Sequence, residues 1–289
     1  MQYPEITHIA KNPTLEGQVE LKQNIVYSSA DGVDRVLTLF LPWSLQHPDI
    51  PTTPRPLIVF VQGSGWQTPN FDYEIPQLAA FAKAGYIVAT VGHRDIFGGH
   101  PYPAFLLDVK SAIRYLRAHA AEYAIDPDHV VIWGTSSGGN TALLVGLTAN
   151  DPAYESDEFQ GISDAVNAVI SCFAPTDVVN LLGVRWRNVG DETFLEAALG
   201  PDREGWDAKL REASPVHWVQ PGKTYPPFLL LHGTADEVVP YEQMLTMYHK
   251  LLDNGVEAKA IAVDGALHEH DFWSPTIYEM IADFIREKI

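Results

Sequence analysis

The sequence has one cysteine, few basic residues and no long apolar run. Cys172 is the single cysteine among 289 residues, so no disulfide can form within the chain, and its apolar neighbours predict a buried thiol. Lysine and arginine number 19 against 37 aspartate and glutamate, which gives a formal net charge of −18. A surface of that charge repels phosphate backbones and anionic lipids, so we expect neither a nucleic acid nor a membrane as partner.

The N-terminus lacks the basic segment and apolar core of a secretion signal, and no apolar run approaches the roughly 18 residues of a membrane span. We expect either a cytoplasmic protein or a secreted one whose signal has been removed. His232 and the other scattered histidines are expected to be packed in the core or to lie on the surface, and they lack the spacing to a second ligand that a metal site needs. No metal and no cofactor are therefore expected, and the sequence leaves open whether the chain forms a homodimer.

Strand patterns alternate with helix patterns from residue 57 to the C-terminus. Residues 57–61 are continuously apolar, as in a strand buried on both faces, whereas residues 19–27 and 36–41 alternate apolar and polar side chains, as in an antiparallel hairpin at a sheet edge. The alternation predicts an α/β fold, with a mostly parallel, doubly wound sheet and helices on both faces. Further strands are expected at 86–91, 130–133, 165–173, 228–231 and 257–263, and helices at 74–84, 108–123, 141–147, 241–254 and 275–289.

Two of these regions have an informative composition. The helix expected at 108–123 has one apolar face, with Arg114 and Arg117 on the other. Residues 177–216 interrupt the alternation with several short helix patterns that are rich in tryptophan and charge, which indicates a small cap inserted over the site. With no internal repeat or low-complexity tract, we expect a single domain over residues 1–289 that includes this cap.

A Gly-Xaa-Ser-Xaa-Gly sequence at residues 134–138 lies between an apolar strand pattern and a helix pattern. This strand–turn–helix context is the one that a nucleophile elbow requires. Gly134 and Gly138 remove the Cβ atoms that would clash in so sharp a turn, and Ser136 is expected in a strained conformation with its hydroxyl above the sheet. The alternative is a structural serine in a glycine-rich turn.

A serine hydroxyl becomes a strong nucleophile only when a base takes its proton and an acid orients that base. In this kind of fold the order along the chain is serine, acid, histidine. Asp236 follows the strand expected at 228–231 and is the preferred acid, with Glu237 as its competitor and a helix N-cap as the structural alternative for Asp236. His268 lies in the loop after the last strand and is preferred over His270 as the base.

The negative oxygen formed during ester cleavage needs hydrogen-bond donors that are already in place. The backbone N–H of Ser137 is one candidate, and those of Ser64 and Gly65, in the small-residue loop after the strand at 57–61, are the others. Losing one such donor typically costs about 3 kcal/mol of transition-state stabilisation. An ordinary strand-to-helix turn would explain the small residues without explaining why they accompany an elbow.

Residues 62–66, Gln-Gly-Ser-Gly-Trp, resemble the His-Gly-Gly-Gly-Trp oxyanion loop of the α/β-hydrolase superfamily, in its carboxylesterase branch related to hormone-sensitive lipase. The resemblance extends in motif order over roughly residues 55–275 and implies an α/β-hydrolase fold. Gln62 stands where that branch usually has His, and Ser64 where it usually has Gly. The backbone donors are unaffected, but the side chain that supports the loop is changed. Other similar segments lie at 101–104, 108–112 and 126–128.

Gln-Gly-Ser-Gly-Trp also looks like the variant found in small bacterial bifunctional feruloyl and acetyl-xylan esterases. That resemblance implies a serine carboxylic ester hydrolase that removes acetyl or feruloyl groups from xylan fragments without a cofactor, so the expected partner is a small or oligosaccharide ester. The alternatives are a short-chain carboxylesterase, a formamidase or peptidase of the same fold, and a non-catalytic binding module. Exposed tryptophans would suit stacking on sugar or feruloyl rings, with core packing as the alternative for each: Trp66, Trp186, Trp206 and Trp273.

Overall fold

The computed structural model describes residues 6–46, 52–181 and 192–289. Within these ranges, eight strands form one sheet in the order β1-β2-β4-β3-β5-β6-β7-β8. The β1–β2 and β2–β4 pairs are antiparallel and all the others are parallel. The strands are β1 Val19–Ser28, β2 Arg35–Pro42, β3 Arg55–Val61, β4 Ile87–Val91, β5 Ile125–Thr135, β6 Ala168–Cys172, β7 Phe228–Gly233 and β8 Ala258–Val263.

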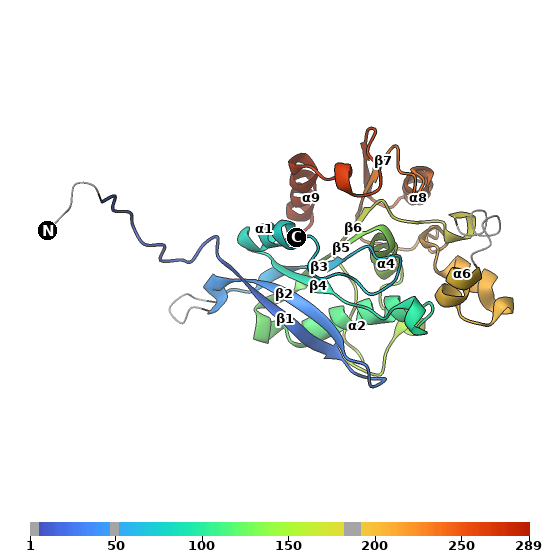
Figure 1. Ribbon diagram of the computed structural model, residues 1–289, viewed down its shortest axis with the longest axis horizontal. Coiled ribbons are helices and arrows are strands. Elements are labelled where there is room, and N and C mark those ends of the chain that lie inside the picture. Colours follow the sequence, from blue (N-terminus) through green and yellow to red (C-terminus); the bar gives the residue numbers. More distant parts are fainter. Residues whose placement is uncertain (1–5, 47–51, 182–191) are drawn as a thin grey trace.

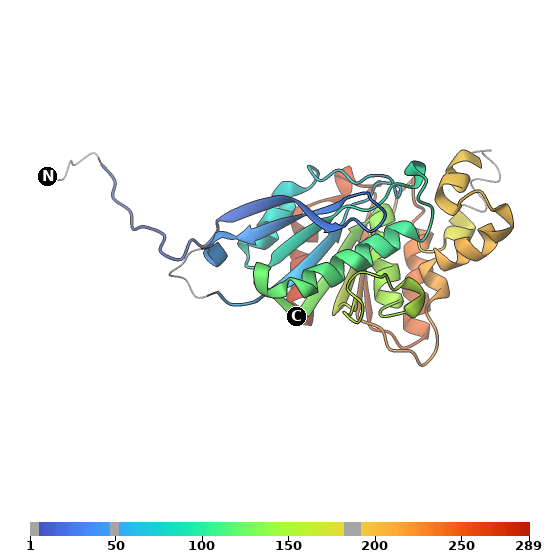
Figure 2. The same cartoon turned by 90° about the horizontal axis from the view of Figure 1, so that it is seen from below.

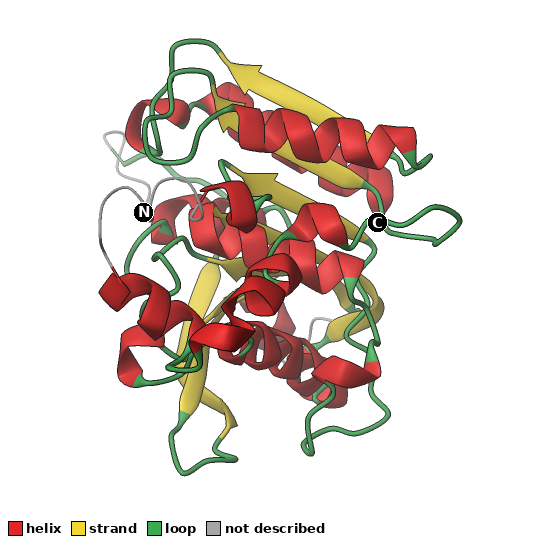
Figure 3. Cartoon of the chain, turned by 90° about the vertical axis from the view of Figure 1, so that its right-hand side faces the viewer, coloured by secondary structure: helices red, strands yellow, loops and turns green. Residues whose placement is uncertain are grey.

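Helices cover both faces of this sheet, as the alternating sequence pattern predicted (Figure 3). In β3, Leu57, Val59 and Val61 belong to the core cluster that also holds side chains of α2, α4 and α8, whereas Ile58 and Phe60 belong to the one that holds side chains of α1 and α9. Successive side chains of a strand point to opposite faces, so a strand between two helical layers must be apolar throughout. The helices are α1 Ile75–Lys83, α2 Ala104–Ala118, α3 Ala120–Tyr123, α4 Ser136–Leu147, α6 Glu192–Leu199, α7 Trp206–Glu212, α8 Glu242–Asp253 and α9 Pro275–Lys288.

The expected N-terminal hairpin is present, with β1 at the edge of the sheet. Residues 6–17 extend away from the body of the molecule before β1 begins (Figures 1 and 2). The short helices α6 and α7, from the segment expected to form a cap, lie at the opposite end of the molecule. Residues 182–191 of that segment, and with them Trp186, lie outside the described residues.

The helix expected at 108–123 differs from the sequence-based prediction in its bounds and surroundings. It begins earlier, at Ala104, and ends at Ala118, after which α3 follows as a separate short helix. The face that carries Arg114 and Arg117 is covered by the segment of residues 148–165. Arg114 donates to Asp164 and to a backbone carbonyl of this segment, and Arg117 donates to two of its backbone carbonyls. Sequence periodicity identified the two faces but not the loop that buries the second one.

The described residues include neither a helix that could span a membrane nor a cluster that could hold a metal ion. Over residues 6–46, 52–181 and 192–289, no helix is both long and apolar enough to cross a bilayer. Over the same ranges, no group of three or more His, Cys, Asp or Glu side chains is arranged to hold a metal ion.

Candidate active site

The site is built on a sharp turn between β5 and α4. β5 ends at Thr135 and α4 begins at Ser136, whose φ of 50° lies in the left-handed region. A non-glycine residue in that region costs on the order of 1–3 kcal/mol, so the surrounding structure must enforce it. A Cβ atom added to Gly134 would lie 2.1 Å from the carbonyl oxygen of Gly138, so the absence of a side chain at Gly134 permits the close approach that tightens this turn. A Cβ atom on Gly138 would lie 2.1 Å from the carbonyl oxygen of Val61, so Gly138 instead permits the approach of the turn to β3.

Three segments far apart in the sequence bring Ser136, His268 and Asp236 together. The Nε2 atom of His268 lies 3.0 Å from the Oγ atom of Ser136, and its Nδ1 atom lies 2.7 Å from the Oδ2 atom of Asp236. The Asp236 side chain is fully buried, whereas the His268 side chain is 14% exposed. Such a chain of contacts matches the geometry by which a base takes a serine proton while a buried acid orients it.

The Asp236 carboxylate is held from both of its oxygens. Its Oδ1 atom accepts hydrogen bonds from the backbone N–H groups of Val238 and Val239, both at 2.8 Å. Burial opposes ionisation of this carboxyl, but hydrogen bonds from His232, His268 and the backbone outweigh it and hold the pKa of Asp236 well below its ordinary value. The acid therefore stays ionised and can orient the imidazole of His268.

His232 has a position at this site that the sequence did not reveal. We expected it to pack or to lie on the surface; it is buried, and its Nε2 atom lies 3.2 Å from Asp236 Oδ2 and 2.9 Å from the carbonyl oxygen of Val239. Both of these partners are acceptors, so Nε2 carries the proton. The available signal was the four-residue spacing from His232 to Asp236 across the end of β7.

Glu237 and His270, the competitors for the roles of acid and base, do not take part in these contacts. Glu237 is exposed and follows Asp236 on the same turn, while Asp236 makes the contact with His268. His270 is exposed and lines a separate pocket with Glu74. The geometry therefore favours Asp236 and His268, as the sequence did.

The loop after β3 packs directly against the elbow. A Cβ atom on Gly63 would lie 2.7 Å from the Cβ atom of Ser136, so only glycine permits this approach. The N–H of Gly63 donates to Thr135 Oγ1 at 2.8 Å, and the N–H of Ser64 donates to Ser137 Oγ at 2.9 Å. Of the three donors expected for the oxyanion, the one on Ser64 is therefore engaged by a side chain of α4.

The other two expected donors have no such partner. The N–H of Gly65 makes no hydrogen bond to the described residues. Ser137 is in the first turn of α4, where a backbone N–H has no acceptor within the helix. At position 62, where the resemblance expected a histidine, the side chain of Gln62 accepts a hydrogen bond from the N–H of Asn70 at 2.6 Å and so supports the loop.

The three described tryptophans of interest have different surroundings. Trp66 is 7% exposed and stacks on Phe105 with ring centroids 5.7 Å apart, which is the arrangement of a core residue. Trp206 donates from Nε1 to the carbonyl of Gly200 at 2.7 Å and is held within the cap segment. Trp273 is partly buried and lines the pocket that contains Glu74.

Comparison with known proteins gives a consistent result. The BD-FAE family model matches residues 44–251. Esterase LipC of Mycobacterium tuberculosis is 31% identical over 207 residues, which cover 70% of this chain and 50% of LipC. Esterase LipQ of the same organism is 28% identical over 246 residues, covering 84% of this chain and 57% of LipQ. The chain thus spans about half the length of the curated relatives it matches.

Solved structures of similar length share the fold. A truncated carbohydrate esterase from gut microbiota superimposes with a TM-score of 0.77 and 27% identity, covering 96% of this chain and 99% of that one. The thermophilic esterase Est2 of Thermogutta terrifontis superimposes with a TM-score of 0.73 and 29% identity, covering 95% of this chain and 94% of Est2. The fold, the shared esterase structures and the extent of the family match together show that the chain belongs to the BD-FAE family and is an α/β-hydrolase that resembles carbohydrate esterases.

Proposed function

We propose that the protein is a serine carboxylic ester hydrolase in which Ser136 is the nucleophile, His268 the general base and Asp236 the orienting acid. The observation that carries this proposal is the continuous chain of contacts from Ser136 Oγ through His268 to Asp236 at a strand-to-helix turn. The BD-FAE match and the esterase relatives support the same class of reaction.

In the first half of the reaction, Ser136 Oγ attacks the acyl carbon while His268 Nε2 takes the hydroxyl proton. The ionised Asp236 stabilises the imidazolium that forms. His268 then gives this proton to the oxygen of the leaving alcohol, which leaves an acyl group on Ser136. In the second half, His268 takes a proton from water, the water oxygen attacks the acyl carbon, and the acid departs as the proton returns to Ser136.

The negative charge on the carbonyl oxygen requires donors at the elbow. We assign this role to the N–H groups of Gly65 and Ser137, with that of Ser64 shared between the oxyanion and Ser137 Oγ. The positive end of the α4 dipole adds to the stabilisation, because α4 begins at Ser136 itself. No metal or cofactor is needed for any of these steps.

The proposed substrates are acetyl or feruloyl esters of xylan fragments. The motif resemblance, the BD-FAE match and the carbohydrate-esterase structure support this choice. We further propose that residues 1–289 form one domain in which residues 177–216 act as a cap. In support, Phe194 of α6 lies 6.4 Å, between ring centroids, from Trp66, which adjoins the candidate oxyanion donor Gly65.

The test is hydrolysis of 4-nitrophenyl acetate and methyl ferulate by the parent protein and by Ser136→Ala. We expect release of both products by the parent and loss of both in Ser136→Ala. The matched control is Ser111→Ala, which alters a buried serine of α2 and should retain activity. Cleavage of the acetate alone would narrow the substrate to acetyl esters, whereas equal activity in Ser136→Ala and the parent would refute the nucleophile assignment.

A further inference from the structure

His232 is the second imidazole that contacts the carboxylate of Asp236. It lies near the end of β7, and its side chain is 1% exposed, against 14% for that of His268. Its Nε2 atom lies 3.2 Å from Asp236 Oδ2, the same oxygen that contacts His268 Nδ1 at 2.7 Å. The two imidazoles therefore share one carboxylate oxygen, and of the two it is His268 that reaches Ser136.

The carboxylate of Asp236 has a full set of hydrogen-bond donors. Its Oδ1 atom accepts the N–H groups of Val238 and Val239, and its Oδ2 atom faces the two imidazoles. Each carboxylate oxygen has two lone pairs, so these four donors use all of them. With His232 in place, Oδ2 has one lone pair left for His268, which fixes the direction from which that imidazole is held.

The ring of His232 is itself held in one orientation. Its Nε2 atom lies 2.9 Å from the carbonyl oxygen of Val239, at the far end of the turn that carries Asp236. Tyr241 packs edge-on against the ring, with ring centroids 6.1 Å apart. Because the proton on Nε2 faces two acceptors, a flipped ring would remove one donor from the carboxylate and one from this buried carbonyl.

His232 also connects the acid to a rigid part of the fold. Its backbone pairs with Ala262 of β8, so the sheet fixes its position. Asp236 and His268 lie instead on the loops that follow β7 and β8. A functional side chain is placed more precisely when a strand supports it than when a loop alone does. The side chain of His232 provides such support, because it extends from the sheet to the carboxylate.

A second donor draws charge away from the oxygen that faces His268. Burial opposes ionisation of Asp236, but hydrogen bonds from His232, His268 and the backbone outweigh it and hold the pKa of Asp236 well below its ordinary value. A nearby carboxylate favours the protonated form of an imidazole, and it does so less strongly when other donors share its charge. Removing the donor of His232 should therefore let His268 keep its proton to a higher pH.

The other ionisable groups around the two imidazoles stay the same when residue 232 is changed. The ring of His268 also packs on the apolar ring of Phe173, at 4.8 Å between centroids. The ionisable side chains on the two loops, or packed on His232, are Glu237, Asp264, Glu269, His270, Asp271 and Tyr241. A change in pH dependence that follows substitution of His232 is therefore due to the donor that was removed.

We propose that His232 is a positioning residue for the reaction described above: it directs Asp236 Oδ2 at His268 and limits the charge that this oxygen presents. The effect on rate rests on the proposed hydrolase function. The effect on protonation of His268 does not, because it depends on the contacts of Asp236 with both imidazoles.

The kinetic test removes the donor of His232 and then restores one. His232→Phe keeps a flat ring beside Tyr241 but has no N–H, whereas His232→Gln offers an amide N–H of similar reach. In His232→Phe we expect kcat for 4-nitrophenyl acetate to fall about tenfold and KM to change less than about twofold, because a misdirected base slows proton transfer more than binding. The acid limb of the kcat/KM profile should rise by about 0.5 pH unit.

Two further variants complete this design. His232→Gln should recover most of the rate and return the acid limb toward that of the parent. The matched control is His119→Phe, which makes the same chemical change at the C-terminal end of α2, where the imidazole stacks on Tyr115. The control should leave the pH profile unchanged.

A nuclear magnetic resonance titration of the histidine rings needs no turnover. In the parent protein the ¹⁵N shifts should place a proton on Nε2 of His232. The titration midpoint of His268 should rise in His232→Phe and return in His232→Gln. If His232→Phe does not fold, His232→Met removes the same donor with a flexible side chain that fills the space.

The possible results separate the two proposals. An unprotonated Nε2 of His232 in the parent would overturn the positioning role without any variant. So would an unchanged acid limb and an unchanged His268 midpoint in His232→Phe, even where the parent cleaves the ester; a fall in Tm and kcat alone would then mark His232 as structural. If the His268 midpoint moves as expected but the parent cleaves no ester, the contact stands and the hydrolase function fails.

Discussion

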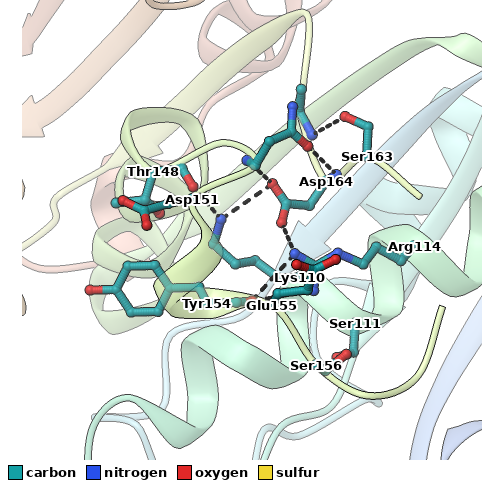
Figure 4. Close-up of polar contacts among 12 residues, drawn as sticks. Lys110, Ser111, Arg114, Thr148, Asp151, Tyr154, Glu155, Ser156, Ser163 and Asp164 are labelled. Atoms are coloured by element: carbon teal, nitrogen blue, oxygen red, sulfur yellow. Dashed lines mark hydrogen bonds and ion pairs between the residues drawn. The ribbon is translucent and has the colours of Figure 1, made fainter. Parts of the chain in front are cut away.

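Asp164 and Asp236 have side chains that are equally shielded from solvent, yet their surroundings give them different properties. Asp164 is paired with Lys110 and Arg114 of α2, and it also accepts the N–H of Asn150 at 2.8 Å (Figure 4). Within the described part of the chain, the partners of Asp236 are two imidazoles and backbone N–H groups. Both carboxylates satisfy the requirement that a buried charge be paired.

The partners decide what each carboxylate can do. An arginine stays protonated throughout the physiological range, whereas an imidazole gains and loses its proton near neutral pH. Burial lowers the pKa of Lys110 to about 8, with Asp164 opposing the shift, but its ammonium has no access to solvent or substrate. His268 is 14% exposed and adjoins Ser136. The first cluster fastens residues 148–165 to α2, and the second is able to move a proton.

Replacing the orienting acid should produce the largest change in activity. In Asp236→Asn the side-chain oxygen still accepts from the backbone, but the amide can hold His268 in the wrong tautomer. We expect kcat for 4-nitrophenyl acetate to fall about 10³–10⁴-fold, as in serine hydrolases with this geometry. The unfolding temperature should change much less than the activity. Retention of more than a tenth of the parent kcat would remove Asp236 from the proposed mechanism.

The corresponding change at Asp164 should lower the stability of the fold rather than the activity. Asp164→Asn leaves Lys110 and Arg114 buried without their countercharge, and breaking such a cluster costs about 3–5 kcal/mol. We expect a fall in Tm on the order of 10 °C, with kcat per folded molecule close to that of the parent. Thermal unfolding of Asp164→Asn and Asp236→Asn side by side checks this. A larger fall in Tm for Asp236→Asn than for Asp164→Asn would contradict this prediction.

The sequence predicted one of these clusters much better than the other. Ser136, Asp236 and His268 each follow a recognisable strand in a fixed order, so the architecture brings them to one edge of the sheet, although their catalytic roles remain proposals. Asp164 follows no motif, and its pairing with Arg114 depends on the path of a loop between α4 and β6. Contacts that depend on loop paths leave no periodicity in the sequence.

The pocket next to the site illustrates the same limit. Sequence reasoning selected Trp273 as a substrate-binding candidate, but its neighbours Glu74 and Gln77 come from the N-terminal end of α1, about 200 residues earlier. Spacing along the chain cannot pair residues across that distance. The fold class and the positions of the strands along the chain were accessible because they follow from the alternation of apolar patterns, while the contacts between α1 and α9 depend on how these two helices lie side by side.

Glu74 extends the comparison to a carboxyl that has no cationic partner among the described residues. Its folded pKa of about 8 is above the unfolded value near 4.5, so the folded state binds the proton more tightly. Its contribution to stability is therefore complete below pH 4.5 and is lost as the pH rises through about 8. Glu74→Gln should match the parent at pH 4.5 and exceed it by on the order of 2 kcal/mol at pH 9, allowing for partial solvent contact.

Urea unfolding at several pH values measures this difference. Glu269→Gln is the informative second variant, because it removes the neighbouring charge that raises the pKa of Glu74 and should reduce the pH-dependent difference. An equal stability gain from Glu74→Gln at pH 4.5 and at pH 9 would show that the carboxyl is ordinary.

The smallest effect is expected where a side chain supports the oxyanion loop. Ser137 Oγ accepts the N–H of Ser64 at 2.9 Å and ties this loop to α4. Ser137→Ala removes a hydrogen bond worth about 1 kcal/mol, so kcat/KM for 4-nitrophenyl acetate should fall about fivefold, while Ser111→Ala, the same chemical change in α2, should have no effect. A rise in kcat/KM would instead mean that releasing the N–H of Ser64 to the oxyanion gains more than the loss of its hydrogen bond to Ser137 costs. The loop would then rely on the contact of Gly63 with Thr135 for its position.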